Sequence, residues 1–148
     1  MIKPELFQYV NESVNDWKLA IKVASKPLVE NKIVLVEFIS KLISETIRLG
    51  PYYILTENIA LGHISPDKSI LQNSLSLTIF SKAISFKNDG KHNVKFLFML
   101  TSLDSNAHMT IMSKFAVILS NENFRNRLND VESYQDWLNL YEEYKGIK

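Results

Sequence analysis

Hydrophobic positions near the start of the chain recur with the period of a helix. Between residues 17 and 28 the apolar side chains share one helical face: Trp17, Ala20, Ile21, Ala24 and Leu28. Asn15 and Asp16 stand just before this run and are candidate N-caps, since their side chains can accept a hydrogen bond from a free backbone N–H. The pattern predicts a first helix, with Pro27 marking a kink or the final turn.

A second amphipathic helix is predicted over residues 34–47. Its inward face is expected to consist of Leu35, Phe38, Ile39, Leu42 and Ile43. The charged side chains of Glu37, Lys41 and Glu45 fall on the opposite face. Gly50 and Pro51 follow directly, and this pair is typical of a helix end.

Shorter apolar runs predict strands at residues 6–10, 52–55, 59–61, 74–79, 83–86 and 94–100. The runs at 52–55 and 59–61 are expected to be buried. Residues 74–79 alternate between small polar and apolar side chains, the period of a half-buried strand. Residues 96–100 are continuously apolar, which predicts a central strand covered on both faces. Residues 87–93 form a polar loop with an Asp-Gly turn signal.

The last third of the chain is predicted to be helical. A helix opens at residues 104–106, with core positions expected at Met109, Met112, Phe115, Ala116 and Leu119. A short helix near 121–128 and a last one from about 131 to 144 complete the chain. These elements favour an α/β fold: a single domain over residues 1–148, with a central mixed β-sheet and helices on both faces.

The composition limits the classes of function. The 148 residues, 46% hydrophobic and 22% charged, suit one globular domain. The net charge of +1, without a block of either sign, argues against nucleic acid or an acidic membrane surface as a partner. The absence of cysteine excludes disulfides and thiolate chemistry. No signal peptide is evident and no apolar run approaches the roughly 18 residues that span a bilayer, so we expect a cytoplasmic protein without direct membrane insertion.

His63 is the main candidate for chemistry. The two predicted strands at 52–55 and 59–61 lead to Gly62, whose lack of a side chain permits an unusual backbone conformation or a close approach by a partner or an anion. A neutral imidazole can act as a nucleophile near pH 7 without a separate base. On these residues alone, a structural histidine at a strand end remains an alternative.

His108 is the second candidate, in the first turn of the helix that opens at Asp104. Free backbone N–H groups and the helix dipole favour an anion there, and the imidazole could donate a hydrogen bond to a phosphoryl oxygen. His108 could instead have only a structural role, as a residue that caps the helix or packs against its neighbours. His63, His108 and Asp104 could instead hold a metal, although no tight ligand spacing is present. His92, in the polar loop, is expected to be a solvated surface residue.

Two motifs together resemble a known family. The stretch Gly50-Pro51-Tyr52-Tyr53, then Asn58-Ile59-Ala60-Leu61-Gly62-His63 and Pro66, resembles the active-site signature of mannitol/fructose-type enzyme IIA domains of the bacterial phosphotransferase system. It is most similar to the ascorbate branch, whose Asp-x-Asn-x-His segment resembles Asp104 to His108. The resemblance runs from about Trp17 to the last helix, agrees with the α/β fold, and implies that His63 accepts a phosphoryl group while His108 faces it.

The resemblance implies a phosphotransferase with a phosphohistidine intermediate, acting as a phosphoryl carrier of a sugar phosphotransferase system. His63 would accept phosphate from the histidine carrier protein HPr and pass it to a cysteine of a IIB component serving ascorbate or a related sugar. No metal or organic cofactor is implied, since such transfer depends mainly on orientation and charge stabilisation. Leu61 and Ile64 are expected to form an apolar docking patch for small, transient interfaces.

The sequence also departs from that family. Relatives commonly carry Pro before the histidine, and Gly or Ala then Arg after it, where this chain has Gly62, Ile64 and Ser65. Arg48 is a possible phosphoryl ligand, but its spacing differs and it could simply be a C-terminal helix cation. The acidic loop of many relatives is replaced by residues 87–91. Two alternatives therefore stay open: a regulatory IIA-type phosphoacceptor that binds a transporter or regulator, and a non-catalytic binding module.

Overall fold

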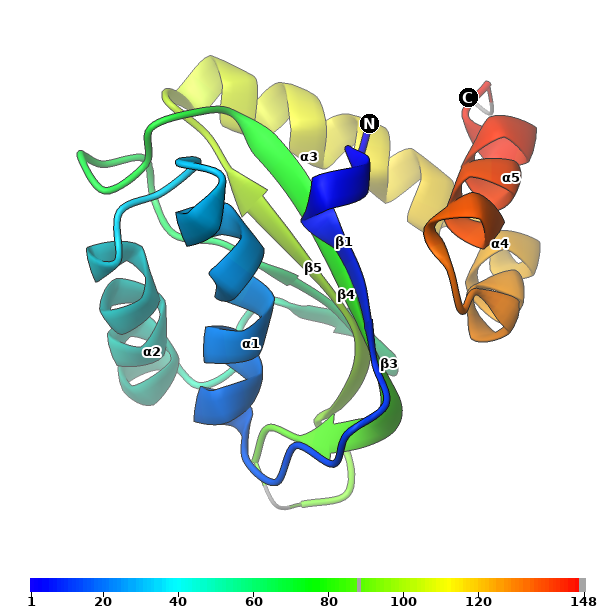
Figure 1. Cartoon of the computed structure of the whole chain (residues 1–148), viewed down its shortest axis with the longest axis horizontal. Coiled ribbons are helices and arrows are strands. Elements are labelled where there is room, and N and C mark those ends of the chain that lie inside the picture. The colour runs from blue at the N-terminus through cyan, green and yellow to red at the C-terminus, as the bar shows by residue number, and fades with distance from the viewer. Residues whose placement is uncertain (88, 147–148) are drawn as a thin grey trace.

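A five-stranded mixed sheet forms the middle layer of the computed structural model, which describes residues 1–87 and 89–146 (Figure 1). In spatial order its strands are β1 (Phe7–Val10), β4 (Ser74–Ser85), β5 (Asn93–Thr101), β3 (Asn58–Gly62) and β2 (Ile54–Thr56). The pairs β1–β4 and β3–β5 are parallel, whereas β4–β5 and β2–β3 are antiparallel. The sheet is therefore mixed, with β5 at its centre.

Helices cover both faces of this sheet (Figure 1). On one face lie α1 (Trp17–Glu30) and α2 (Glu37–Leu49); on the other lie α3 (Ser105–Leu119), α4 (Glu122–Arg127) and α5 (Tyr134–Tyr144). Short 3₁₀ turns, η1 (Pro4–Leu6) and η2 (Leu128–Asp130), complete the elements. The arrangement confirms the predicted α/β class. None of the helices in the described part of the chain combines the length and apolarity needed to cross a membrane.

Strand β5 shows how the two helical layers share one core. The Met99 sulfur lies 3.7 Å from Ser25 Oγ of α1, while the preceding Phe98 ring packs 4.5 Å from Phe115 of α3 and 5.9 Å from Trp137 of α5. Adjacent strand residues point to opposite faces, so both faces of β5 must be apolar. This confirms the predicted central strand.

Three strand predictions need correction. The predicted strands at 74–79 and 83–86 belong, except for Phe86, to one long strand, β4, whose register shifts between Ile79 and Ile84. Its polar positions Ser76 and Thr78 are buried rather than exposed, because helices cover both faces. The first half of the predicted buried pair, β2, is an edge strand with Leu55 46% exposed, because only β3 pairs with it.

The helix predictions hold for α1 and fail in part for α2 and α3. Asp16 caps α1 by accepting from Leu19 N at 2.9 Å, and Pro27 lies in the last turn. Helix α2 begins only at Glu37, because Val34 bridges Ile70 and the Leu35 N–H donates to Ser69 O; Leu35 is consequently exposed. In α3 the buried side chains are Phe115, Ile118 and Leu119, whereas Met109 and Ala116 are exposed.

Candidate active site

His63 stands directly after β3, next to the central strand of the sheet. Two residues with positive φ shape the chain that leads there. Gly50 (φ 75°) ends α2, where a side chain would be strained, and Asn58 (φ 67°) makes the tight turn between β2 and β3. The buried run Ile59–Leu61 then fixes the strand, so that half-buried His63 is held by a rigid element.

Gly62 does not provide the close approach expected from the sequence. Its φ is not in the left-handed region, and a Cβ there would lie 3.5 Å from Leu42 Cδ2, 3.6 Å from Met99 Cε and 3.7 Å from Leu97 Cδ1. That side of the backbone faces the protein core. The His63 ring lies instead beside His108 of α3, the helix on the face of the sheet opposite α2.

The hydrogen bond of His63 fixes its tautomer. Nδ1 lies 2.7 Å from the carbonyl oxygen of Leu61. A carbonyl oxygen can only accept, so Nδ1 carries the proton and Nε2 keeps its lone pair. Among the described residues no hydrogen-bond partner occupies Nε2. The lone pair of Nε2 is thus free to react or to accept a hydrogen bond.

Tyr52 holds His63 from the side of the β2 hairpin. Its O–H donates to the His63 carbonyl oxygen at 2.5 Å, and its ring meets the imidazole edge to face at 5.5 Å between centroids. Tyr52 belongs to the Gly50-Pro51-Tyr52-Tyr53 motif, but its position there did not predict this contact with His63. The neighbouring Tyr53 is buried and pairs instead with Thr46 Oγ1 at 2.8 Å.

His108 lies beside His63, as the sequence predicted. Asp104 caps α3 by accepting from Ala107 N at 2.8 Å, which puts His108 in the first turn. The centroids of the two imidazoles are 5.3 Å apart. Ser102, a buried residue that sequence reasoning missed, has its hydroxyl 3.2 Å from His108 Nδ1. When the Ser102 hydroxyl donates to Nδ1, His108 carries its proton on Nε2. The Nε2–H group can then donate a hydrogen bond to an anion.

The electrostatics of the site favour a neutral His63. Burial lowers the pKa of His63, the hydrogen bond to Leu61 opposes this, and the nearby His108 lowers the pKa further. Burial lowers a histidine pKa because imidazolium loses hydration. His63 therefore stays unprotonated, and nucleophilic, at and somewhat below neutral pH.

Other candidates from the sequence lie elsewhere or act differently. Asp104 is engaged as a helix cap, and the described residues contain no group of three or more His, Asp or Glu side chains arranged for a metal. His92 pairs with Asp89 through Nδ1 and Oδ2 at 2.5 Å in the polar loop, of which residue 88 lies outside the described residues. Its side chain is 35% exposed, so His92 is only partly solvated, and it does not join the two site histidines.

The surroundings of His63 correct the predicted docking patch. Leu61 and Ile64 are buried, with 1% and 6% of their surfaces exposed, because Leu61 lies within the sheet and Ile64 packs in the core cluster. Two large apolar side chains that reach solvent are instead Tyr52, whose ring contacts His63, and Met109, which follows His108 in α3.

Arg48, the other candidate ligand, is exposed and forms an ion pair with Glu45 at 2.6 Å. The pKa of the Tyr52 hydroxyl is raised, mainly by burial and also by the charge of Glu45, while the charge of Arg48 lowers it.

Comparison with known proteins gives independent evidence on the family and the fold. Residues 1–144 match the family described as phosphoenolpyruvate-dependent sugar phosphotransferase system, EIIA 2. The ascorbate-specific PTS system EIIA component of Mycoplasma pneumoniae is 29% identical over 101 residues, which are 68% of this chain and 63% of that protein. The family match confirms the resemblance inferred from the two histidine motifs.

Two solved structures have the same fold. The solution structure of the mannitol-specific cryptic phosphotransferase enzyme IIA CmtB from Escherichia coli superposes with a TM-score of 0.85 at 22% identity, covering 96% of this chain and 95% of that one. The complex of enzyme IIAMTL and phosphorylated enzyme IIBMTL from Escherichia coli gives a TM-score of 0.79 at 19% identity, with 97% and 98% covered.

Proposed function

The chain belongs to the EIIA 2 family of the phosphoenolpyruvate-dependent sugar phosphotransferase system, and from this premise we propose that it carries a phosphoryl group on Nε2 of His63. The observation that supports this atom is the 2.7 Å contact between His63 Nδ1 and the Leu61 carbonyl. It commits one ring nitrogen to the protein and leaves the other as the nucleophile. The donor is phosphorylated HPr, and the acceptor is a cysteine of a IIB component.

The Leu61 carbonyl helps both halves of the carrier cycle. When Nε2 attacks phosphorus, a P–N bond forms as the donor's P–N bond breaks, and positive charge develops on the His63 ring. The Nδ1–H bond to Leu61 stabilises that charge. Because Nδ1 keeps its proton, the product is a phosphoimidazolium, which is a good leaving group. The contact with Leu61 therefore assists loading by stabilising the charge, and the proton that it keeps on Nδ1 assists onward transfer, because the ring leaves as a neutral imidazole.

His108 stabilises the charge on the moving phosphoryl group. With Ser102 donating to its Nδ1, the His108 Nε2–H is available to a phosphoryl oxygen between the two rings, whose centroids are 5.3 Å apart. Such a donor is aligned before the reaction starts and does not have to reorganise. Ser102 acts through His108 and is a positioning residue.

Docking of HPr and IIB uses the apolar side chains around the two histidines. Tyr52 (39% exposed) and Met109 (62%) present this surface. Tyr52 contacts the His63 ring, and Met109 follows His108 in the chain. A patch this small suits partners that must leave after each transfer. The sugar served is ascorbate or a related compound, and the protein acts in the cytoplasm.

The test is phosphorylation in vitro with enzyme I, HPr and phosphoenolpyruvate, followed by mass spectrometry. We expect one acid-labile, alkali-stable group on the wild-type protein and none on His63→Ala. The variant His92→Ala is the matched control, since it removes a histidine away from the site, and it should label fully. Heteronuclear NMR of the phosphorylated ring should place the group on Nε2. Labelling of His63→Ala, or attachment at Nδ1, would contradict the proposal.

A further inference from the structure

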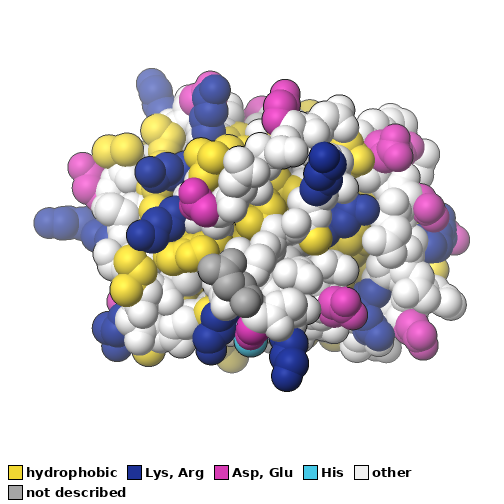
Figure 2. Space-filling view, turned by 90° about the horizontal axis from the view of Figure 1, so that it is seen from below, with side chains coloured by type: hydrophobic (Ala, Val, Ile, Leu, Met, Phe, Trp, Pro, Cys, Tyr) yellow, Lys and Arg dark blue, Asp and Glu magenta, His cyan; other side chains and the backbone are white. Residues whose placement is uncertain are grey.

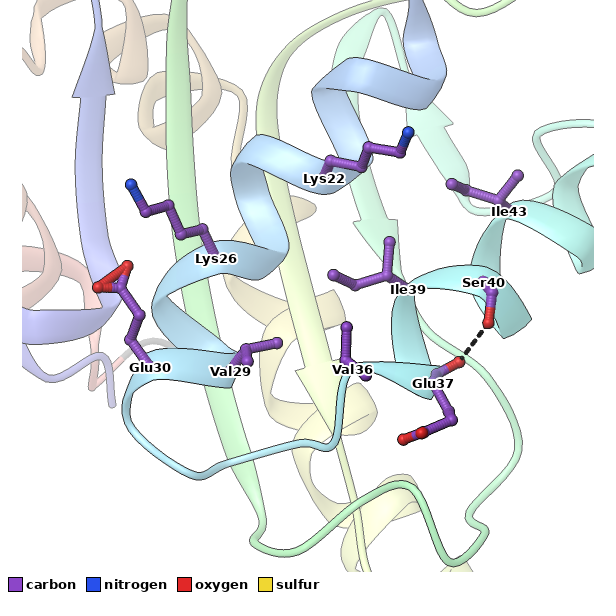
Figure 3. Close-up of a pocket in the computed structure, with 9 residues that line it drawn as sticks. All are labelled: Lys22, Lys26, Val29, Glu30, Val36, Glu37, Ile39, Ser40 and Ile43. Atoms are coloured by element: carbon purple, nitrogen blue, oxygen red, sulfur yellow. Dashed lines mark hydrogen bonds between the residues drawn. The ribbon is translucent and has the colours of Figure 1, made fainter.

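A groove of about 630 Å³ lies between α1 and α2, on the face of the sheet opposite α3 and the two histidines (Figures 1 and 3). Its floor is formed by Val29 of α1, by Val36, and by Ile39 and Ile43 of α2. These side chains point into the space between the helices in Figure 3. Nothing in the proposed phosphoryl transfer uses this face.

The apolar surface of the groove is larger than its floor. Val36 is 62% exposed, and Ile47, one turn beyond Ile43 on α2, is 63% exposed. Positions 36, 39, 43 and 47 recur at helical spacing, so they form one stripe. Figure 2 shows hydrophobic side chains, with lysine and arginine side chains among them, on the side of the molecule where α1 and α2 lie in Figure 1. A contiguous apolar stripe with a charged rim is typical of a protein interface.

The charges on the rim are separated along the groove. Glu30 ends α1 and Glu37 begins α2, so both lie at the end where the two helices connect. Lys26 and Lys22 lie about one and two turns before Glu30 on α1, away from that connection. All four side chains are exposed, and within the described part of the chain none of them forms an ion pair. One half of the rim is therefore basic and the other half is acidic.

We propose that this groove is the interface of a symmetric homodimer, with a second copy of the chain as its occupant. A two-fold axis that crosses the helices between Lys26 and Glu30 reverses the order of charges in the second copy. Lys26 then faces Glu30 of the second copy and Lys22 faces its Glu37, and each pair occurs twice. An isologous interface requires this self-complementarity, and a uniformly charged rim would oppose it.

The hydrophobic stripes meet in the same arrangement. In Figure 3 Val29 and Val36 lie beside the two glutamates, Ile39 lies midway along the groove and Ile43 lies toward Lys22, so the axis brings Ile39 against its own copy and the two valines against Ile43 of the second copy. Apolar contact at the centre with charged pairs at the edge is the usual layout of a protein interface. His63 and His108 lie on the other face of the sheet, so both phosphoryl sites of the dimer stay open to partners.

Sedimentation velocity across micromolar to millimolar concentrations tests the proposal with two charge-reversed variants. Lys22→Glu/Lys26→Glu makes the rim wholly acidic, and Glu30→Lys/Glu37→Lys makes it wholly basic. We expect wild type to dimerise with rising concentration, and each variant to stay monomeric where wild type is at least half dimer. An equimolar mixture of the two variants should recover the dimer, because every cross-pair is again a lysine with a glutamate.

Controls separate the interface from general charge and folding effects. Lys3→Glu/Lys114→Glu changes the net charge as much as the first variant but alters exposed residues outside the groove, and it should dimerise like wild type. Thermal unfolding of every variant should match wild type, since all substituted side chains are exposed. A wild type that is monomeric throughout, variants that dimerise normally, or a mixture that stays monomeric would each overturn the proposal.

Discussion

Replacing His108 by alanine tests whether the site works with two histidines. The substitution removes the Nε2–H that we place against the phosphoryl oxygens, and it leaves His63 and its bond to Leu61 in position. Losing one preorganised donor typically slows such reactions by a factor on the order of 10²–10³, or about 3–4 kcal/mol of activation free energy. His108→Ala should therefore still become labelled, whereas His63→Ala should not.

The stability cost of the same change follows from Ser102. This residue is 1% exposed, and its hydroxyl contacts His108 Nδ1 at 3.2 Å. Without the imidazole, that hydroxyl lacks its partner, which typically costs about 1–3 kcal/mol of unfolding free energy. Removing both groups costs less than removing one, so Ser102→Ala/His108→Ala should be more stable than His108→Ala alone.

The assay combines rapid-quench phosphorylation by phosphorylated HPr with urea unfolding of the same samples. Ser102→Ala is the informative intermediate: it keeps the His108 ring but frees its tautomer, so its rate should lie between wild type and His108→Ala. If folded His108→Ala is labelled as fast as wild type, His108 has no part in transfer. If the double variant is no more stable than His108→Ala, the Ser102 contact has been misjudged.

Three further predictions concern neighbouring groups and solution conditions. Tyr52→Phe loses the hydrogen bond to the His63 carbonyl and should slow labelling by up to about tenfold, with about 1 kcal/mol of stability lost. In the wild type the Tyr53 hydroxyl pairs with Thr46, so Tyr53→Phe should lower stability without slowing labelling. Because burial lowers the pKa of His63, the unfolded chain binds more protons below about pH 6.5, so acidification through that range should destabilise wild type more than His63→Gln in denaturant titrations. Raising salt from low to physiological should slow transfer by less than roughly tenfold, since apolar residues surround the site; a steep dependence in the quench assay would reveal an electrostatic docking surface.

The sequence predicted those elements in which the pattern of apolar and polar side chains has only one interpretation. The apolar run at residues 96–100 requires cover on both faces, and it forms the central strand. The same rule could not be applied to residues 74–79, because Ser76 and Thr78 look like solvent positions. They are buried because β1 and β5 pair with β4 while helices cover its faces, a tertiary arrangement that a single strand's pattern does not contain.

The sequence predicted which histidines form the candidate site, but it did not predict the contacts that hold them. Histidines 45 positions apart were paired through motif resemblance, and the structure brings their rings to 5.3 Å. Ser102 gave no signal in the sequence, since a serine after an apolar strand is common at a strand end. Leu61 and Ile64 were assigned to a docking patch because they flank His63, but their burial follows from the strand and core contacts around them.

The departures from the family motif make sense if the carrier depends on neutral groups. An arginine two residues after the histidine would put a fixed positive charge beside the phosphoryl group, and this chain has the exposed Ser65 there. Arg48, the candidate phosphoryl ligand of the sequence analysis, is paired with Glu45, whose charge offsets it. A strong cation in contact would stabilise phosphohistidine and so slow its onward transfer, because the lost stabilisation adds to the next barrier. The Leu61 carbonyl keeps the proton on Nδ1, so that the phosphoimidazolium of the proposed cycle can leave as a neutral imidazole, while His108 donates to the phosphoryl oxygens without adding a fixed charge beside them.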